Sequence, residues 1–448
     1  MDSTIFKAYD IRGVYPEQID EETVYKIAQA YASLVNPKTV ALGRDVRTSG
    51  ESLWVAARNG LIDHGVDVVD IGVISTDMLY FGVAHYKYDG GITISASHNP
   101  AEYNGMKMVR ANAVPISGDT GIQDIRKLVE GGYNQKADKS GELSQKDITD
   151  EYLATCLKFI DMSKVKPYKV VANAMFGPAL QNVIKMNLPI ELKMLNEIPD
   201  GTFPKGQPDP MQEGNRLETT QLIQNEHADF GVAWDGDADR FFLFDESGRF
   251  IPGYYLTAFF GEYFARKHHG SKIIYDPRLT WATVDAVSKG GGVPVVNKAG
   301  HSFIKERMRK EGAVFAGEMS GHYYFKDYYY CDNGLIPFLL FLEILSQQPE
   351  GTKVSELFDR FFQLYPISGE INTKLNSQEE VNGKLDKIQG HYQDAQLDKT
   401  DGLTIEYHDW RANIRGSNTE PLIRVNVEAN NKDLVDEKVK EIIDLIRD

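Results

Sequence analysis

Three polar segments of the chain contain the residue types that act in catalysis and ligand binding. The first, residues 95–100 (Ser-Ala-Ser-His-Asn-Pro), follows the apolar, β-branched run 92–94. The run is typical of a buried strand, and the Ser-His-Asn-Pro turn ends it. We therefore expect the hydroxyl of Ser97 and the imidazole of His98 at the carboxyl end of a strand, where open α/β sheets bind ligands.

The second segment follows the apolar residues 230–234, and in it Asp235, Asp237 and Asp239 alternate with Gly and Ala. Carboxylates this close repel one another unless a cation lies among them, and oxygen ligands favour Mg²⁺ or Ca²⁺. A calcium-binding EF-hand loop is one alternative, but its required Gly is Arg240 here, and residues 241–244 (Phe-Phe-Leu-Phe) indicate a buried strand. A solvated acidic turn is the other alternative. We favour a Mg²⁺ site with an open position, as phosphoryl transfer requires.

The third segment, residues 415–419 (Arg-Gly-Ser-Asn-Thr), offers a guanidinium and three small polar side chains. Its Gly leaves the backbone N–H groups unobstructed, and the combination suits a phosphate dianion. A simple hairpin turn is the alternative interpretation.

Other residues are weaker candidates for a functional site. Glu318 and Ser320 lie between two flexible glycines and offer acceptors for neutral hydroxyls, as sugar binding requires. His301 opens a predicted helix and is equally consistent with an ordinary cap residue. Tyr9 and Arg12 precede any clear element.

The elements that position these segments follow a repeating order. Strand, helix, strand, helix, strand and polar loop occur three times, which predicts sheets with parallel strands and right-handed crossovers. The predicted elements are residues 39–42, 51–64, 66–71, 77–85 and 91–95; then 169–172, 178–186, 191–195, 216–227 and 230–234; then 272–275, 279–288, 294–296, 303–310 and 313–316. Residues 105–109 and 113–116 are expected as an antiparallel addition to the first set.

The C-terminal part differs in kind. Predicted antiparallel strands at 368–374, 404–408, 412–414 and 422–428 accompany predicted helices at 379–389 and 432–447. The expected fold is three consecutive similar α/β domains with mixed sheets plus a C-terminal α+β domain, arranged around one central cleft. The expected domains are residues 1–146, 147–250, 251–366 and 367–448, with one polar loop in each.

Composition excludes several classes of protein. The 448 residues are 42% hydrophobic and 25% charged, with a formal net charge of −16, which disfavours a nucleic-acid or anionic membrane surface. Cys156 and Cys331 lie far apart and indicate neither a disulfide framework nor a zinc site. The start lacks the build of a signal peptide, and the apolar run 335–342 is too short to span a bilayer. We expect a soluble cytoplasmic protein with no nucleic-acid or membrane partner.

Taken together, the loops resemble those of the α-D-phosphohexomutase superfamily, and within it the bacterial-type phosphomannomutase/phosphoglucomutase. The resemblance covers essentially the whole chain. The phosphoserine loop of the family is similar to residues 95–100 and its Mg²⁺ loop to 235–240. Its sugar loop is similar to 317–322 and its phosphate loop to 415–419.

The resemblance implies an isomerase that moves a phosphoryl group within a hexose phosphate. Phosphorylated Ser97 would complete the shell of one Mg²⁺ with Asp235, Asp237 and Asp239. Its phosphoryl group would pass to a hexose 1-phosphate or 6-phosphate, giving a 1,6-bisphosphate that turns round and returns the other phosphoryl group to Ser97. Glucose 1,6-bisphosphate would serve as activator and intermediate.

The resemblance also implies roles for the remaining residues. A cationic or donating wall would consist of Arg12, His98, Lys107 and Arg240. The sugar-binding and phosphate-binding residues would be Tyr9, Arg278, Glu318, Ser320, His322, Arg415, Ser417, Asn418 and Thr419. Lys107 and His301 are two alternatives for proton transfer. Arg278 stands where relatives commonly carry Lys, and Ile94 stands where they are often Thr-like.

Several interpretations of the function stay open. Met319 in the sugar loop is typical of the mannose/glucose branch, and a phosphoglucosamine mutase is the alternative. A non-catalytic sugar-phosphate-binding protein and a phosphoserine-dependent phosphatase are the others. The partners expected are small sugar phosphates, and the protein is expected to be a monomer or a small homo-oligomer.

Overall fold

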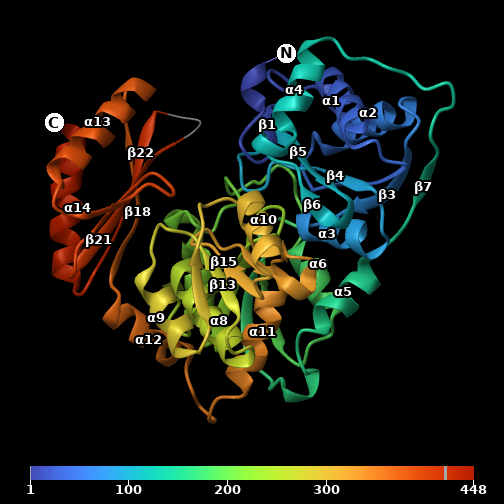
Figure 1. Ribbon diagram of the computed structural model, residues 1–448. Helices are drawn as coiled ribbons and strands as arrows, with labels where there is room; N and C mark the ends of the chain where they lie inside the picture. Colours follow the sequence, from blue (N-terminus) through green and yellow to red (C-terminus); the bar gives the residue numbers. More distant parts are fainter. Residues whose placement is uncertain (1, 418–420) are drawn as a thin grey trace. The chain divides into compact units, whose positions relative to one another are not determined.

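The computed structural model describes residues 2–417 and 421–448, and the chain divides into two compact units (Figure 1). The first unit comprises Met1–Ile251 and His322–Val354. The second comprises Pro252–Gly321 and Ser355–Asp448. The chain thus leaves the first unit, returns to it for one segment, and leaves it again.

The first sheet of the first unit has the order β1-β5-β4-β2-β3-β7, and β6 pairs with β5. Its strands are β1 (Ile11–Val14), β2 (Thr39–Arg44), β3 (Asp67–Val73), β4 (Gly90–Ile94), β5 (Tyr103–Arg110), β6 (Val114–Pro115) and β7 (Leu143–Gln145). β4 and β3 flank β2 in parallel, whereas β5 runs antiparallel to β4. All five residues of β4 are buried, as its β-branched sequence predicts.

Helices cover both faces of this sheet. The helices α1 (Glu21–Val35), α2 (Gly50–Asp63) and α4 (Ile122–Glu130) cover one face, and α3 (Thr76–His85) covers the other (Figure 1). The α1 helix begins at Asp20, whose side chain accepts a hydrogen bond from the Thr23 amide, and it ends at Asn36 in the left-handed region. These are favourable caps, and the apolar side of the helix enters the core with Val40 and Leu42 of β2.

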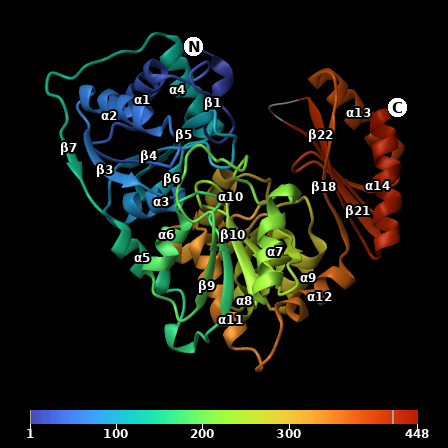
Figure 2. The same cartoon turned by 180° about the vertical axis from the view of Figure 1, so that it is seen from behind.

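The second sheet of the first unit has the order β12-β11-β10-β8-β9. Its strands are β8 (Lys169–Asn173), β9 (Glu191–Leu195), β10 (Phe230–Trp234), β11 (Phe241–Phe244) and β12 (Phe250–Ile251), accompanied by α5 (Thr149–Leu157), α6 (Ala179–Lys185) and α7 (Leu217–Glu226). The α7 helix packs along β8 and β10 (Figure 2). The buried strand expected after the aspartate triplet is confirmed as β11.

The returning segment of the first unit supplies the hairpin β16 (Tyr323–Phe325) and β17 (Cys331–Asp332), followed by α11 (Leu335–Ser346). All twelve residues of α11 are buried, and the Phe338 and Phe341 rings contact Trp234 and Phe230 of β10. A helix that is apolar on every side is typical of a protein core. Within the described residues, every helix is too short or too polar to cross a bilayer.

The second unit contains the strands β13 (Lys272–Tyr275), β14 (Val293–Val296) and β15 (Phe315–Gly317), with β13 parallel to both neighbours. Its first helices are α8 (Gly253–Lys267), α9 (Trp281–Lys289), α10 (His301–Glu311) and α12 (Val354–Leu364). An antiparallel sheet follows in the order β18-β22-β21-β20-β19, covered on one face by α13 (Gln378–His391) and α14 (Lys432–Arg447) (Figures 1 and 2). Its strands are β18 (Ile367–Lys374), β19 (Gln396–Asp398), β20 (Leu403–Glu406), β21 (Trp410–Gly416) and β22 (Leu422–Ala429).

The predicted repeat is confirmed. The orders β2-α2-β3-α3-β4, β8-α6-β9-α7-β10 and β13-α9-β14-α10-β15 follow one plan, with the first strand of each set between the other two. The C-terminal α+β region is confirmed as well. The helices α1, α8 and α11, which lie outside the repeat, are not predicted from the sequence, and the strand expected at 113–116 is only the two-residue β6.

Candidate active site

Ser97 lies in the turn directly after β4, where the sequence predicted it. Its side chain is fully buried, and its backbone has a φ of 51°, in the left-handed region that residues with a Cβ rarely adopt. The Ser97 amide donates to the Ser95 hydroxyl over 2.9 Å. The turn therefore points the Ser97 hydroxyl away from the strand and holds its backbone in place.

The aspartate loop after β10 meets the Ser97 turn. Ser97 Oγ donates to Asp235 Oδ2 over 2.9 Å, and the carboxyl groups of Asp235, Asp237 and Asp239 are all buried. Gly236 permits this approach, because a Cβ there would lie only 2.8 Å from the Ser97 carbonyl oxygen. Two loops from different sheets thus bring a hydroxyl and three carboxylates together.

Lys107, on β5, faces this carboxylate cluster. Its Nζ lies 2.7 Å from Asp237 Oδ2 and 2.6 Å from Asp239 Oδ2. Burial alone would lower the pKa of Lys107, but the charges of Asp237 and Asp239 raise it above its usual range. Burial and the two neighbouring carboxylates raise the pKa of Asp235 well above its usual range. The carboxylates thus carry more negative charge than Lys107 alone compensates.

The cluster has the properties of a metal site. One oxygen of each of Asp235, Asp237 and Asp239 lies within 4.8 Å of the others, in an arrangement that could hold an ion. Asp237 Oδ1 is buried and accepts no hydrogen bond from the described residues, as suits an oxygen reserved for a cation. Oxygen ligands of this kind suit a hard divalent cation.

Arg12 and His98 border Ser97. Arg12 Nη1 donates to the Ala96 carbonyl over 3.2 Å and to Asn99 Oδ1 over 2.5 Å. His98 Nδ1 lies 3.2 Å from Ser97 Oγ. Burial, together with the charges of Arg240 and Arg12, holds the pKa of His98 well below its usual range, so its imidazole is neutral at neutral pH. Tyr9 lies half-buried in the bend before β1.

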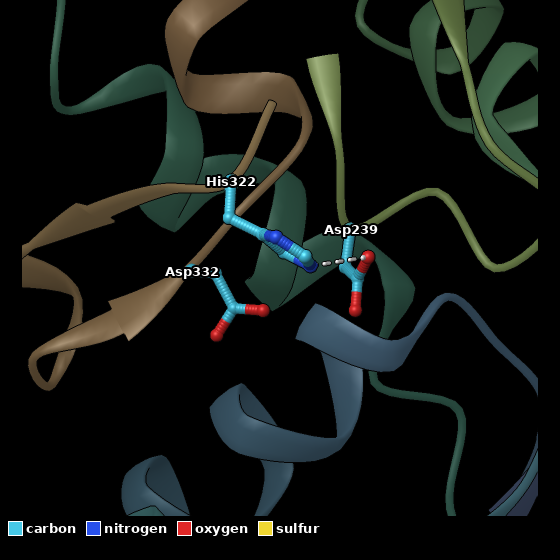
Figure 3. Close-up of side chains that lie close together, drawn as sticks. All are labelled: Asp239, His322 and Asp332. Carbon is cyan, nitrogen blue, oxygen red and sulfur yellow. Dashed lines mark ion pairs between the residues drawn. The ribbon is translucent and has the colours of Figure 1, made fainter. Parts of the chain in front are cut away.

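Arg240 and His322 lie on the other side of the aspartate loop. The Arg240 amide donates to Asp235 Oδ1 over 3.2 Å, and its Nε lies 3.4 Å from His322 Nε2. His322 Nε2 also lies 3.4 Å from Asp239 Oδ1, and Asp332 of β17 is close enough to form a second potential metal-binding group with these two residues (Figure 3). The sequence placed His322 among the substrate-binding residues; here it is a member of the Ser97 cluster.

A second cluster of predicted site residues lies in the second unit, where Asp276 organises it. Both carboxylate oxygens of Asp276 bind the guanidinium of Arg278, at 2.8 and 2.9 Å. The Met319 amide also donates to Asp276 over 2.7 Å. One carboxylate therefore fixes Arg278 and the loop that follows β15.

Glu318 and His301 are joined through a backbone contact. Glu318 Oε1 accepts a hydrogen bond from the Gly300 amide over 2.8 Å, directly before His301 opens α10. The Gly321 amide donates to the Glu318 carbonyl over 3.0 Å, so the half-buried Ser320 lies in a tight turn with Glu318. The predicted sugar-binding residues are thus next to His301.

Arg415 lies near the end of β21, between two carboxylates of the same unit. Its guanidinium is 3.5 Å from Glu370 and 3.7 Å from Asp401. Burial and the nearby charge of Arg278 lower the pKa of Arg415. Ser417 is buried and its amide donates to the Leu422 carbonyl, whereas Asn418 and Thr419 lie outside the described residues. Two arginines close enough to repel are typical of a site for a dianion.

The structure therefore assembles the predicted residues into two sets. Each set lies within one unit: Arg12, Ser97, His98, Lys107, Asp235, Asp237, Asp239, Arg240 and His322 in the first, and Arg278, His301, Glu318, Ser320, Arg415 and Ser417 in the second.

Sequence reasoning missed residues that hold these sets in place. Thr76 opens α3, and its hydroxyl lies 2.5 Å from Asp237 Oδ2 while its amide donates to the Asp237 carbonyl over 3.0 Å. Arg47 contacts the Ser97 turn, and Asp276 fixes Arg278. Thr76 and Arg47 closely follow parallel strands, which is the signal that could have found them.

Comparison with known families covers most of the chain. Residues 3–136, 150–248 and 252–365 match phosphoglucomutase/phosphomannomutase alpha/beta/alpha domains I, II and III. Residues 370–445 match the C-terminal domain of the same family.

Individual proteins agree with this match. A phosphomannomutase of Salmonella montevideo is 44% identical over 99% of both chains. A protein named phosphohexose mutases, from Xanthomonas campestris pv. campestris (strain B100), is 42% identical over 99% of both. The crystal structure of a phosphoglucomutase/phosphomannomutase family protein from Burkholderia thailandensis is 30% identical, with a TM-score of 0.88 over 100% of this chain and 98% of that one.

Proposed function

The chain belongs to the phosphoglucomutase/phosphomannomutase family, and we propose that it interconverts hexose 1-phosphates and hexose 6-phosphates of mannose and glucose. It is an isomerase of the phosphohexose mutase type. The proposal adds a phosphorylated Ser97 and a hexose 1,6-bisphosphate intermediate.

One observation carries the proposal: the buried hydroxyl of Ser97 lies 2.9 Å from Asp235, in a cluster of three carboxylates. A serine that only bound sugar would need neither the carboxylates nor the burial. A serine that accepts and returns a phosphoryl group needs a fixed position and concentrated charge around it.

Mg²⁺ fits the carboxylate oxygens of Asp235, Asp237 and Asp239, with phosphorylated Ser97 as a further oxygen ligand. Once bound, Mg²⁺ would supply positive charge to the phosphoryl oxygens during transfer. The ammonium of Lys107 and the guanidinium of Arg240, whose Nε lies 3.5 Å from Asp235 Oδ2, border the same carboxylates and add positive charge there.

The proposed transfer has two half-reactions. In the first half-reaction the Oγ–P bond of phosphorylated Ser97 breaks, and the free hydroxyl oxygen of the hexose monophosphate forms a bond to phosphorus. The hydroxyl proton passes to a base of the site, and Ser97 Oγ regains a proton. The bisphosphate then turns round in the site. In the second half-reaction Ser97 Oγ gives up its proton and forms a bond to the other phosphorus, while the bond between that phosphorus and its sugar oxygen breaks. The sugar oxygen takes up a proton, and the hexose phosphate leaves with its phosphate at the other carbon.

Residues of the second unit suit the part of the substrate that does not react. The positive charges of Arg278 and Arg415, with Ser417, Asn418 and Thr419, suit a phosphate dianion. Glu318 and Ser320 offer polar groups for sugar hydroxyls. From the first unit, we propose His322 and Tyr9 as further substrate-binding groups and Arg12 as a catalytic group. The proposal requires both sets of residues to contact one substrate molecule.

The contacts of Lys107 help to decide which residue transfers the proton of the sugar hydroxyl. Lys107 Nζ is engaged by two carboxylates at 2.7 and 2.6 Å, which favours charge stabilisation over proton transfer. Of the two alternatives from the sequence, His301 is therefore the better proton carrier. His98, which faces Ser97 Oγ, is proposed to orient that oxygen.

A coupled assay tests the proposal with mannose, glucose and glucosamine 1-phosphates as substrates. Glucose 1,6-bisphosphate and Mg²⁺ are added, and released phosphate is measured in parallel. We expect isomerisation of the mannose and glucose phosphates with little phosphate release. Preference for glucosamine 1-phosphate would make it a phosphoglucosamine mutase, phosphate release alone a phosphatase, and binding without turnover a sugar-phosphate-binding protein.

The remaining sequence expectations stay predictions. They are domain bounds at 146/147, 250/251 and 366/367, a cytoplasmic location, and a monomer or small homo-oligomer. Limited proteolysis of the purified protein tests the domain bounds, and light scattering tests the oligomeric state. Cell fractionation tests the location.

A further inference from the structure

Arg47 is a buried arginine that follows β2 in the first unit and contacts the backbone of the Ser97 turn. It is only 2% exposed. Its Nη2 donates to the carbonyl oxygens of Ser97 over 2.8 Å and Asn99 over 2.6 Å. Its Nη1 donates to those of Pro100 over 2.6 Å and Tyr103 over 2.9 Å.

The fifth donor of the guanidinium faces a carboxylate. Arg47 Nε lies 3.3 Å from Asp45 Oδ2, and the Asp45 amide donates to the Ile94 carbonyl at the end of β4. A guanidinium has five N–H groups in a planar fork, and four of those of Arg47 donate to carbonyl oxygens, whereas Nε lies within ion-pair distance of Asp45 without forming a hydrogen bond. The Phe203 ring lies 5.0 Å from the guanidinium carbon. Both terminal nitrogens of Arg47 are therefore engaged by the backbone of the loop, and the side chain is buried away from solvent.

The contact matters because Ser97 is in a costly backbone conformation. Its φ of 51° is left-handed, a conformation that is unfavourable for a residue with a Cβ and persists only where the surroundings enforce it. Arg47 binds the carbonyl of that same residue and carbonyls on the far side of the turn. The fork thus fixes the peptide that sets the direction of the Ser97 side chain.

We propose that Arg47 is a positioning residue for the nucleophile: its fork holds the 97–103 backbone so that Ser97 Oγ stays directed at Asp235 while the phosphoryl group is given and taken back. This inference rests on the proposed function for its catalytic consequence. The loop geometry itself does not depend on that function. A lysine is a poor substitute, because its compact ammonium cannot reach four carbonyls as a planar fork does.

Arg47→Lys and Arg47→Ala test the proposal, with Arg58→Lys on the outer side of α2 as the matched control. Two properties are measured: steady-state kinetics per folded molecule, and hydrogen–deuterium exchange of residues 97–103. We expect Arg47→Lys to lower kcat by about 100-fold, as a misplacement of about 1 Å does, and to leave KM within about threefold. Exchange in 97–103 should rise while that of β2, β4 and α2 stays unchanged, and Arg58→Lys should behave as the wild type.

Three results would overturn the proposal. They are wild-type kcat in Arg47→Lys, an unchanged exchange rate in 97–103, and a loss of activity that only tracks the folded fraction. If Arg47→Ala fails to fold, the kinetics and exchange of Arg47→Lys still test the proposal. If the wild type lacks mutase activity while exchange in 97–103 rises as expected, the proposed function fails and the role of Arg47 in holding the loop stands.

Discussion

The two clusters of site residues balance their charges differently. In the first unit, Lys107 and Arg240 are cationic neighbours of Asp235, Asp237 and Asp239, and Asp237 Oδ1 is buried without a donor among the described residues. The cluster is rich in negative charge and would be completed by a cation.

In the second unit each cation has its carboxylate. Asp276 binds Arg278 through both oxygens, and Arg415 lies between Glu370 and Asp401. The guanidinium groups of this cluster are thus near carboxylates of the same unit. Under the proposed function we expect the first set to act in phosphoryl transfer and the second in substrate recognition, so substitutions should separate into effects on kcat and on KM.

The largest expected effect is that of Ser97→Ala. Loss of the only proposed phosphoryl acceptor should lower mutase turnover by at least about 1,000-fold, with the fold intact, because no neighbouring group replaces a covalent relay. Turnover with added glucose 1,6-bisphosphate and intact mass of the protein measure this. The wild type should carry one phosphoryl group in part of the population. The exposed Ser163→Ala is the control, and near wild-type turnover in Ser97→Ala would exclude the relay.

Metal removal should have the next largest effect. EDTA should abolish activity and Mg²⁺ should restore it, and Asp237→Asn should lower kcat by about 100-fold at limiting Mg²⁺ while sugar-phosphate affinity changes little. Titration of activity with Mg²⁺ measures the effect on kcat, and calorimetry with glucose 1-phosphate measures the effect on sugar-phosphate affinity. Asp124→Asn, exposed on α4, should match the wild type. Full activity in a metal-stripped sample would contradict the role given to the aspartates.

Arg415→Ala should act on binding instead. A charge-assisted contact contributes about 1.5–3 kcal/mol, so we expect a loss of roughly 10- to 150-fold in kcat/KM, mainly through KM and alike for mannose and glucose 1-phosphates. The guanidinium interacts with the phosphate that both substrates share. Kinetics with both substrates and detection of released bisphosphate check this, with the exposed Arg447→Ala as control. A changed mannose-to-glucose preference would instead assign the loop to sugar discrimination.

The smallest effect is a difference in acid stability. Burial raises the pKa of Asp276, but the charge of Arg278 and the hydrogen bonds from Arg278 and the Met319 amide together outweigh it and lower the pKa in the folded protein. A carboxyl with a lowered folded-state pKa stabilises the fold above its unfolded pKa of about 3.9, and this contribution is lost as pH falls below that value.

The free energy of unfolding in urea, measured at several pH values for the wild type and Asp276→Asn, checks the direction of this pH dependence. The variant should be less stable at pH 7, and the difference should shrink toward pH 3. Asp386→Asn, at an exposed position of α13, is the control. A difference that stays constant with pH would mean that Asp276 acts through packing or hydrogen bonds alone.

The parts of the fold and site that depend on local sequence could be predicted. The Ser97 turn is marked by a β-branched run that stops in polar residues, and the aspartate triplet by its spacing. The three strand–helix repeats follow from apolar periodicity. The α1 helix carried a usable signal that went unused, since Asp20 precedes two glutamates and an amphipathic stretch.

What escaped prediction depends on contacts between distant segments. Arg47 binds the carbonyl of Ser97, 50 residues along the chain, and Thr76 binds Asp237, 161 residues along it. Neither contact is marked by a pattern in the neighbouring sequence. The α11 helix is apolar on all sides, so its sequence has no helical period and indicated only an apolar run.

The return of the chain to the first unit has a consequence for synthesis. The α11 helix packs against Phe230 and Trp234, and His322 joins the aspartate cluster, yet both come after the 70 residues from 252 to 321. A nascent chain that has emerged only to residue 251 leaves these aromatic rings uncovered and the Ser97 cluster without its second imidazole. The first unit therefore becomes complete only late in translation, when most of the chain has left the ribosome.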